Sequence, residues 1–517
     1  MAYRLGIDVG GTNTDAVIMA DNTVVASTKT HTTPDVASGI HTAIAKVLAE
    51  SGIKPAAITA AMLGTTQATN AIVERKQLAA VGVVRLGYPA TAAITPYTEW
   101  PADLVAALSG TYKLVHGGYE YDGQLLTAVD DDELRATFTA WRGKVQAIAI
   151  VGVFSALNRD QEEHAAAIAR EVFGADMPVS LSATIGSLGL ITRENATILN
   201  AGLNQVIRRV TSGFAKALAD EGITAASVYL CQNDGTLMAL DFAARYPILT
   251  IGSGPTNSIR GAAYLAKRSD ALVLDIGGTT SDLGVLVHDF PRESSQAVTV
   301  GGVQTNFRMP DILSIGLGGG SIVRTQPDGS VTVGPDSVGY QITERALCFG
   351  GDTMTATDIA VRLGHVKLGD PALTQVIPQA TAEAAAAEIQ RLLADAIDKM
   401  KTSAEPVDLI LVGGGAVIVT AKLAGTATTY QSPLGGVANA IGATIAQVGG
   451  QAEKLYQYVS VPRAEAIADA TQAAKQQAIA AGAVPATVDV VDIDELPLQY
   501  APGEATRVKV KVVGQMA

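Results

Sequence analysis

The sequence predicts an α/β protein built from two similar halves that face each other across a cleft. Short β-rich segments alternate with amphipathic helices along most of the chain, which is typical of layered α/β domains. A strand, a glycine-rich turn and a second strand occur at residues 3–19 and again at residues 271–287. This repeat predicts a duplicated module, in which two equivalent turns lie opposite each other.

The first half opens with three β-rich segments and a helix. Residues 3–9, 15–19 and 23–30 are separated by Gly-Gly-Thr-Asn and Asp-Asn turn signals, which predicts three short strands in succession. Apolar residues then recur at helical spacing over 36–51, and Gly52 follows them, so a helix is predicted there. The alternation continues with predicted strands at 60–63, 79–84 and 147–154 and predicted helices at 68–75 and 161–173.

The second half ends in a third glycine turn. A helix is predicted over 382–401, with Thr381 as its N-cap, because the segment is rich in Ala, Glu, Leu and Lys. An apolar strand at 408–412 follows, and then the turn Gly413-Gly414-Gly415.

The C-terminal residues predict a small α/β extension. One or two Ala- and Gln-rich helices are predicted at 452–482, and strands at 488–494 and 507–513. The expected units are therefore an N-terminal half at 1–190, a second half at 191–450 and the extension at 451–517.

Composition restricts the class of protein. Hydrophobic residues make up 48% of the 517 residues and charged residues 17%, as in folded globular proteins. The formal net charge is −13 and no block of Lys and Arg is present, so neither a nucleic acid nor a membrane is an expected partner. The apolar runs have strand length, and no signal-peptide stretch opens the sequence. We expect a cytoplasmic protein in which Cys231 and Cys348 are buried, inert thiols.

The two strand–turn–strand units carry the chemistry. In each, an Asp ends an apolar strand, two glycines follow, and hydroxyl or amide side chains come next. The two sets are Asp8, Gly10, Gly11, Thr12 and Asn13, and Asp275, Gly277, Gly278, Thr279 and Thr280. Glycine lets the backbone approach an anion without a Cβ in the way, and the hydroxyl groups add donors.

One such turn alone is equally well explained as a tight hairpin with a solvated Asp. The second copy favours a pair of phosphate-binding turns. Facing each other, the two hairpins would hold a polyphosphate, while Asp8 and Asp275 would hold hydrated Mg²⁺ and orient the attacking group.

The third turn, Gly413, Gly414 and Gly415, follows a strand of the buried type. Bare backbone there suits an adenine or a ribose, although a glycine-rich connection to a helix explains it as well. Two phosphate turns and a glycine turn in this order resemble the ATP site of actin, hexokinase and the heat-shock ATPases. The resemblance implies duplicated RNase H-like domains that flank an ATP cleft.

Other segments resemble the short form of the hydantoinase/oxoprolinase A family. Residues 64–75 are similar to its HGTTxATNAxxER element, and residues 253–262 to its SGPAGGxxGA element. Further landmarks lie at 117–123, 193–201, 318–321 and 355–358, so the resemblance covers residues 1 to about 450. The sequence departs from the family at Leu63, where members usually have His, and at 311–316, which lack the His of DIHTVGAGGGS.

The resemblance implies an enzyme in which ATP phosphorylates the amide oxygen of a cyclic imide or lactam, after which water opens the ring. An amide is a poor electrophile, and phosphorylation turns its oxygen into a good leaving group. By motif position, Thr12, Asn13, Thr279 and Thr280 would contact phosphates and Gly413–Gly415 the nucleoside, while Asp8 and Asp275 would serve Mg²⁺ and proton transfer. Family members commonly work beside a B-type subunit, so a homo- or hetero-oligomer is expected.

The remaining candidates are substrate contacts: Thr65, Thr66, Arg193, Asn195 and Asp311. Arg193 and Asn195 would hold a substrate carboxylate or carbonyl, although Arg193 at the start of a helix is equally explained as solvated. Asp311 would bind metal or substrate, or cap the glycine turn that follows it. The six histidines lack HxH or HExxH spacing, so a zinc site is not expected.

Four functions stay open on the sequence. The leading one is ATP-dependent hydrolysis of a hydantoin, lactam or 5-oxoproline-like ring. The second is the ATP-using subunit of a ketone carboxylase, whose turnover would depend on bicarbonate. The third is a small-molecule kinase that releases a stable phosphorylated product, and the fourth is a non-catalytic sensor or filament-forming ATPase.

Overall fold

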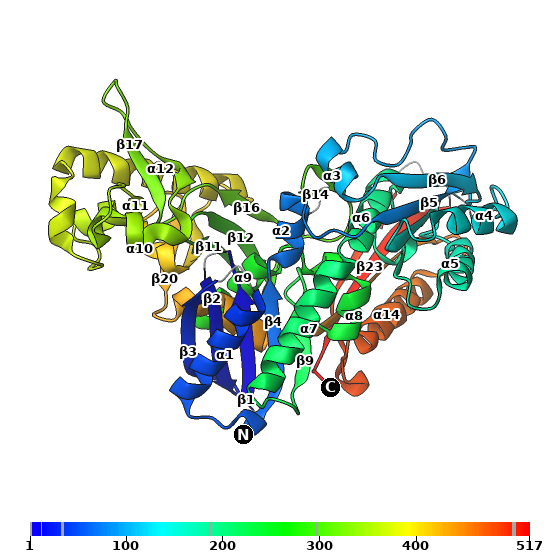
Figure 1. Cartoon of the computed structure of the whole chain (residues 1–517), viewed down its shortest axis with the longest axis horizontal. Coiled ribbons are helices and arrows are strands. Elements are labelled where there is room, and N and C mark those ends of the chain that lie inside the picture. The colour runs from blue at the N-terminus through cyan, green and yellow to red at the C-terminus, as the bar shows by residue number, and fades with distance from the viewer. Residues whose placement is uncertain are drawn as a thin grey trace.

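The computed structural model describes residues 3–11, 13–32, 36–121, 123–186, 188–294, 298–498 and 503–517. These residues form sheets of nine, six and four strands and two short hairpins, with helices packed on the sheets (Figure 1). The α/β class predicted from the alternation of strands and helices is confirmed.

The nine-stranded sheet contains the first predicted module. Its strands, in spatial order, are β22 (Asp489–Pro497), β23 (Ala505–Gly514), β21 (Val448–Gln457), β10 (Leu237–Ala239), β9 (Ser227–Cys231), β4 (Ile58–Thr65), β1 (Tyr3–Val9), β2 (Asn13–Ala20) and β3 (Thr23–His31). The helices that pack on it are α1 (Val36–Ser51), α7 (Asn204–Asp220), α8 (Leu240–Arg245), α9 (Ser253–Ala266), α13 (Ala438–Ile445) and α14 (Arg463–Ala480). β1 runs antiparallel to β2 and parallel to β4.

The two faces of β1 serve different purposes. Leu5 and Ile7 lie in the apolar core that the strand shares with α1, as the two-residue period of a strand requires. Gly6 and Asp8 face α13 instead, and a Cβ at Gly6 would overlap the backbone oxygen of Ala440. One face of the strand therefore builds the core, while the other brings a carboxylate against a helix that comes from far along the chain.

The six-stranded sheet repeats this arrangement. It consists of β13 (Phe290–Pro291), β12 (Ser281–Val287), β11 (Ala271–Ile276), β19 (Val407–Val412) and β20 (Thr426–Gln431), with β16 (Ile312–Ile315) paired to β12. β11 runs antiparallel to β12 and parallel to β19, as β1 does to β2 and β4. Asp8 lies opposite Asp15 in the first ladder, and Asp275 lies opposite Asp282 in the second. The predicted duplication is confirmed at the level of register.

The core of the second half is covered by helices on the outer side of the molecule. The helices there are α10 (Ile342–Arg345), α11 (Ala356–Arg362) and α12 (Gln379–Met400), and the hairpin β17 (Ser321–Thr325) with β18 (Val331–Ser337) projects beside them (Figure 1). The prediction of Thr381 as the N-cap of the long helix is wrong, because the helix begins at Gln379, three residues earlier than predicted, and its N-cap is Pro378. Proline suits this position because its φ is already helical.

A four-stranded parallel sheet is inserted between β4 and β9. Its order is β6 (Thr111–His116), β5 (Val81–Tyr88), β7 (Ala147–Gly152) and β8 (Val179–Leu181), and the helices around it are α2 (Gln67–Glu74), α3 (Ala102–Ala107), α4 (Asp131–Trp141), α5 (Asp160–Phe173) and α6 (Leu190–Gly202). Every residue of β7 is buried, as expected for a parallel strand covered on both faces. A small hairpin, β14 (Val298–Val300) with β15 (Val303–Thr305), packs on α6 and α2.

The C-terminal segment is an α/β extension attached by strand pairing. β21 pairs with β10 on one side and with β23 on the other, so the extension lengthens the first sheet across the boundary expected at residue 450. The predicted helices over 452–482 are corrected in part, since residues up to Gln457 are strand and the helix is α14. Ala466, Ala470, Ala474 and Ala478 form a buried stripe on α14, and a Cβ at Gly450 would overlap the backbone of that helix. Small residues thus bring α14 close to β21, and the strand is fixed by its neighbours rather than by its composition.

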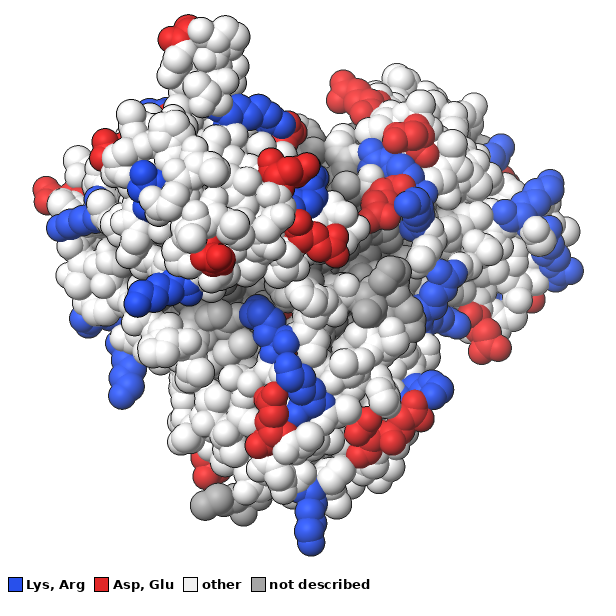
Figure 2. Space-filling model, turned by 60° about the vertical axis from the view of Figure 1, so that its left-hand side comes forward, with Lys and Arg blue, Asp and Glu red and all other residues white. Residues whose placement is uncertain are grey.

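The surface carries charges of both signs. Lys and Arg are interspersed with Asp and Glu over the face drawn in Figure 2, which is furrowed between its lobes. Among the described residues, no helix combines the length and the apolar character needed to cross a membrane.

Candidate active site

The two glycine hairpins are closed by equivalent backbone hydrogen bonds. In the first, the Gly10 N–H donates to the Asn13 carbonyl at 3.0 Å, and in the second the Gly277 N–H donates to the Thr280 carbonyl at 2.9 Å. A Cβ at Gly11 or at Gly278 would meet no protein atom within 4 Å, so the backbone at both tips borders open space. Thr279 and Thr280 are exposed and Asn13 is half-buried, while Thr12 lies outside the described residues. The turns can therefore receive an anion on bare backbone.

Asp8 is a buried carboxylate with two amide donors. It is 3% exposed, and its oxygens accept hydrogen bonds from Asn257 Nδ2 at 3.3 Å and from Asn439 Nδ2 at 2.9 Å. Burial and the neighbouring Asp15 carboxylate raise the pKa of Asp8 to about 6, although both amide hydrogen bonds lower it. The charge of Asp275 raises it further, so the carboxylates of the two halves lie within electrostatic reach of each other.

The second half supplies an equivalent pair. Burial raises the pKa of Asp275, whose carboxylate accepts a hydrogen bond from Ser258. Burial also raises the pKa of Asp282 to about 6, and Ser314 donates to its carboxylate. Four carboxylates, Asp8, Asp15, Asp275 and Asp282, thus form one electrostatic cluster, in which Asp15 and Asp275 act on Asp8 and Asp275 acts on Asp282.

One helix connects the two halves of this cluster. Asn257 and Ser258 are consecutive residues of α9, and they donate to Asp8 and Asp275 respectively. α9 crosses α13 at very close range, because a Cβ at Gly261 would overlap the Ala438 carbonyl and one at Gly442 would overlap the Asn257 carbonyl. Only glycine permits this approach, and the crossing places the amide donors against Asp8.

The third glycine turn packs directly on the second hairpin. Gly413 has a φ of +88°, and a Cβ there would overlap the Ile276 carbonyl and the Asp275 carboxylate. A Cβ at Gly415 would overlap the Gly277 carbonyl. Gly414 is exposed, and a Cβ there would meet nothing within 4 Å. The turn therefore supports Asp275 with two glycines and presents the third to open space.

A further glycine run supports the same hairpin from another side. The N–H groups of Gly319 and Gly320 donate to the carbonyls of Gly277 and Gly278 at 3.0 and 2.7 Å. The hydroxyl of Thr357 donates to the Gly319 carbonyl at 2.8 Å, which ties α11 to this support. The glycine run therefore supports the hairpin through its carbonyl groups and leaves the side on which a Cβ of Gly278 would lie open.

The donor set fits a hydrated divalent cation. No cluster of three or more His, Cys, Asp or Glu side chains with metal-binding geometry occurs among the described residues. Mg²⁺ does not need one, since it is bound by one or two carboxylates together with water and phosphate oxygens. Burial first, and then the charges of Asp15 and Asp275, raise the pKa of Asp8, and a cation would offset both effects. Asp8 and Asp275 are the residues that would hold it.

Thr65 and Thr66 lie beside the first hairpin. Thr65 is the last residue of β4 and pairs with Val9 of β1. The Thr66 hydroxyl donates to the Val9 carbonyl at 3.4 Å, and Ser253, at the start of α9, donates to the Thr65 carbonyl at 3.3 Å. The structure therefore brings these two predicted substrate contacts next to the first hairpin.

Arg193 and Asn195 have structural partners elsewhere. Arg193 is buried in α6, where its guanidinium donates to the Ser182 hydroxyl and the Gly152 carbonyl, so the solvated alternative is wrong. Asn195 accepts from Trp100 Nε1 and donates to the Gln304 carbonyl, each at 2.9 Å. Both residues join α6 to its surroundings and are not directed at the hairpins.

Asp311 is held by an arginine. Arg292 Nη2 and Nε lie 2.6 and 2.9 Å from Asp311 Oδ2, at the start of β16. The Asp311 carboxylate, which the sequence suggested as a ligand for a metal or a substrate, is therefore paired with Arg292.

Sequence reasoning missed several residues of the site. No motif marks Asn257, Ser258, Asn439 or Lys29 as a site residue. Asn257 and Ser258 lie within residues 253–262, whose family resemblance assigned them no role. A usable signal existed for Asp15 and Asp282. Each lies seven residues after the strand-ending Asp, so the paired carboxylates are part of the repeat.

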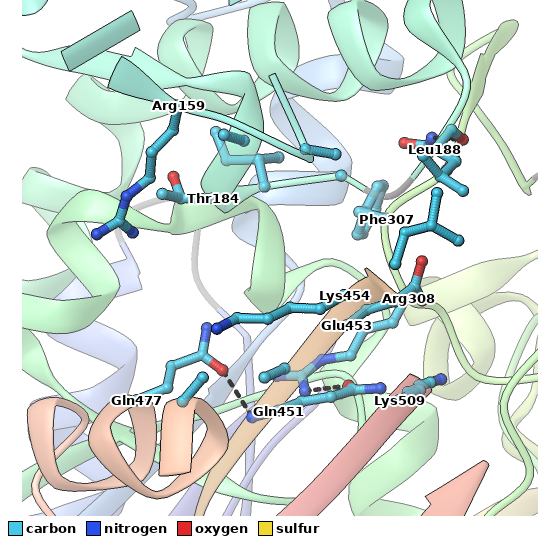
Figure 3. Close-up of a pocket in the computed structure, with 18 of the residues that line it drawn as sticks. Arg159, Thr184, Leu188, Phe307, Arg308, Gln451, Glu453, Lys454, Gln477 and Lys509 are labelled. Atoms are coloured by element: carbon cyan, nitrogen blue, oxygen red, sulfur yellow. Dashed lines mark hydrogen bonds between the residues drawn. The ribbon is translucent and has the colours of Figure 1, made fainter. Parts of the chain in front are cut away.

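A large cavity lies apart from the hairpins. It has a volume of about 1410 Å³ and lies between Lys454 and Gln477 on β21 and α14 and the loops of Arg159, Thr184 and Phe307 (Figure 3). Its described lining includes neither the carboxylate cluster nor any substrate contact predicted from the sequence.

Both cysteines are buried as expected, and burial raises the pKa of Cys348 to about 12.

Comparison with known proteins gives consistent matches. The family model described as the hydantoinase/oxoprolinase N-terminal region matches residues 4–173, and the one described as hydantoinase/oxoprolinase matches residues 193–407. A caprolactamase subunit alpha from Pseudomonas jessenii is 27% identical over 390 residues, which cover 71% of this chain and 55% of that protein. An acetophenone carboxylase gamma subunit from Aromatoleum aromaticum is 24% identical over 254 residues, 47% of this chain and 34% of that protein. The chain thus spans about half or less of the length of these relatives.

A solved structure shows the same fold. The ATP-dependent caprolactamase from Pseudomonas jessenii superimposes with a TM-score of 0.80 at 20% identity, over 99% of this chain and 88% of that one. The agreement extends over both halves and the C-terminal extension.

Proposed function

The chain belongs to the hydantoinase/oxoprolinase family, and from this premise we propose that it uses ATP to hydrolyse a cyclic amide such as a lactam, a hydantoin or a 5-oxoproline-like ring. One observation carries the proposal. Two hairpins closed by equivalent backbone hydrogen bonds present open backbone, and the carboxylates beside them, Asp8 and Asp275, accept hydrogen bonds from consecutive residues of one helix. Such a site suits a polyphosphate and a divalent cation together.

The chain's own residues position and polarise the reactants. ATP would transfer a phosphoryl group to the amide oxygen, and water would then add to the carbonyl carbon. The ring C–N bond would break to leave an acyl phosphate, which a second water hydrolyses, so that the products are ADP, phosphate and the ring-opened acid. The N–H groups of the hairpin tips would hold the phosphates, and Gly414 would border the nucleoside. Asp8, buried beside the first hairpin, would accept a proton from the attacking water. Thr65 and Thr66 would contact the amide, since they lie beside the first hairpin.

A carboxylase role is the second candidate. It is favoured by the likeness to an acetophenone carboxylase gamma subunit, a name that assigns carboxylation of a ketone to that protein alone. The caprolactamase likeness covers more of this chain, 71% against 47%, and it supports the hydrolytic reading. Both relatives are named as subunits, so we also propose that the chain works with a partner polypeptide.

The test is phosphate release from Mg-ATP by the purified chain with caprolactam, hydantoin, 5-oxoproline, or a ketone with bicarbonate. A ring-opened acid formed in step with phosphate supports the proposal. Turnover that requires bicarbonate supports the carboxylase, and a stable phosphorylated product indicates a kinase. Asp8→Asn and Asp275→Asn should each lower turnover by about 100-fold or more, because charge at the phosphate site loses its partner. Asp336→Asn, an exposed carboxylate paired with Arg324, is the matched control.

A further inference from the structure

Lys29 is a cation inside the carboxylate cluster. It lies on β3, directly opposite Asp15 of β2, which in turn lies opposite Asp8 of β1. Residues opposite each other in a ladder share one face of the sheet, so the three side chains form a row beside the first hairpin. The Lys29 ammonium lies 2.7 Å from Asp15 Oδ1 and 2.9 Å from Oδ2.

The charge of Lys29 also acts on Asp275, a carboxylate of the other half of the molecule. Burial raises the pKa of Asp275, and the positive charge of Lys29 opposes that rise. Asp275 is the penultimate residue of β11, next to the second hairpin, so the ammonium acts on carboxylates of both halves. Lys29 therefore lies where a phosphate held between the hairpins would come close to the carboxylates.

The side chain is able to move. Lys29 is 38% exposed, whereas Asp15 is almost fully buried. A lysine has a flexible four-carbon stem and a single charge that adapts to a new acceptor without a fixed geometry. A divalent cation between Asp8 and Asp275 would weaken the hold of the cluster on the ammonium, because like charges repel. The terminal phosphate would offer the ammonium a new anionic partner at that moment.

Resting on the ATP site of the proposed function, we propose that Lys29 leaves Asp15 when Mg-ATP binds and pairs with the terminal phosphate, so that it distinguishes ATP from ADP. In the ATP-free protein the ion pair with Asp15 keeps the Lys29 ammonium close to the position of the terminal phosphate. The alternative is purely structural, with Lys29 doing no more than neutralise Asp15.

The experiment compares nucleotide affinities of the full chain by calorimetry, with Mg-ADP and with a non-hydrolysable Mg-ATP analogue. The variants are Lys29→Met, Asp15→Asn and the double variant. Lys216→Met is the control, because Lys216 also pairs with an Asp but lies on the exposed surface of α7. Lys29→Met should weaken binding of the ATP analogue by about 10- to 100-fold relative to ADP, as expected for the loss of one ion-paired hydrogen bond.

The double variant separates the two roles. It removes both charges of the pair, so a structural role for Lys29 predicts that the ATP preference returns to that of Asp15→Asn. A phosphate contact predicts that the preference stays lost. Equal loss of both affinities in Lys29→Met, or recovery in the double variant, would overturn the inference alone. Failure of the wild-type chain to bind either nucleotide would overturn the proposed ATP site and this inference with it.

Discussion

Asn257 and Ser258 are neighbours on α9, yet their side chains bind carboxylates from different halves of the protein. Asn257 Nδ2 donates to Asp8 Oδ1 at 3.3 Å, and the Ser258 hydroxyl donates to Asp275. Asp8 is the penultimate residue of β1 in the nine-stranded sheet, and Asp275 is the penultimate residue of β11, the equivalent strand of the six-stranded sheet. One rigid helix therefore fixes how the two carboxylates are spaced, and any movement of α9 changes both of them together.

The first prediction tests this connection. Ser258→Ala should lower ATP turnover by about 10- to 100-fold, the usual effect of removing a group that orients a metal-binding carboxylate. Ser258→Thr keeps the hydroxyl and should recover most of the activity. Steady-state phosphate release measures both, with Ser212→Ala on the surface of α7 as the control. Wild-type turnover in Ser258→Ala would show that the hydrogen bond does not position Asp275.

The second prediction concerns pH. The pKa of Asp8 is raised from 3.8 to about 6, so the folded protein binds this proton more tightly than the unfolded chain does. The stability contributed by Asp8 is therefore present below about pH 4 and falls as the pH rises to about 6, with no further change above that. In the presence of a chelator, Asp8→Asn should gain about 3 kcal/mol of unfolding free energy relative to wild type between pH 4 and pH 7. Urea denaturation at both pH values measures the difference, and a constant offset between the two proteins would contradict the raised pKa.

The third prediction separates two adjacent glycines. Gly413→Ala adds a Cβ against the Ile276 carbonyl and the Asp275 carboxylate at a positive φ, and should destabilise the protein by about 1–3 kcal/mol. Gly414→Ala meets no protein atom within 4 Å and should unfold like wild type. It should nevertheless bind nucleotide more weakly, because the added methyl group faces the open side of the turn. Thermal unfolding and nucleotide titration of both variants test this, and unchanged affinity in Gly414→Ala would remove the nucleoside from that position.

The fourth prediction concerns the crossing of α9 and α13. Gly442→Ala places a methyl group on the Asn257 carbonyl, so the helices must separate, at a cost of about 1–3 kcal/mol or more. Gly213→Ala is the matched control, because its Cβ meets only the Ala37 side chain at 3.4 Å. That control should gain roughly 0.5–1 kcal/mol, since alanine is the better helix former. Denaturant unfolding distinguishes the two, and equal effects would mean that the crossing is loose.

Much of the architecture was predictable because its signals are local. The strands and helix of the first unit follow from two-residue and helical periodicity, and the observed helix α1 has the predicted bounds. The hairpins follow from glycine pairs after apolar strands. β21 was misread as helix because Ala and Gln favour helices locally, whereas its pairing with β10 and β23 decides the outcome.

The candidate site was predictable only in its backbone parts. Asp8, Asp275 and the three glycine turns were identified because glycine is required at specific backbone positions and leaves a pattern in the sequence. Arg193, Asn195 and Asp311 carry the right chemical groups for a substrate, but protein partners occupy those groups. Side-chain chemistry alone does not show which partner a polar group has.

The sequence by itself determined the two strand–turn–strand units, their family and the carboxylates that end their strands. These features depend on a few consecutive residues, whose backbone preferences act within one turn or one strand. The tertiary structure alone decided that Asn257, Ser258 and Asn439 hold the carboxylates and that Lys29 joins them. Asn439 and Asp8 lie 431 positions apart, and the contacts of Asn257, Ser258 and Asn439 depend on the crossing of α9 and α13 that glycines allow. Lys29 meets Asp15 through the pairing of β2 with β3.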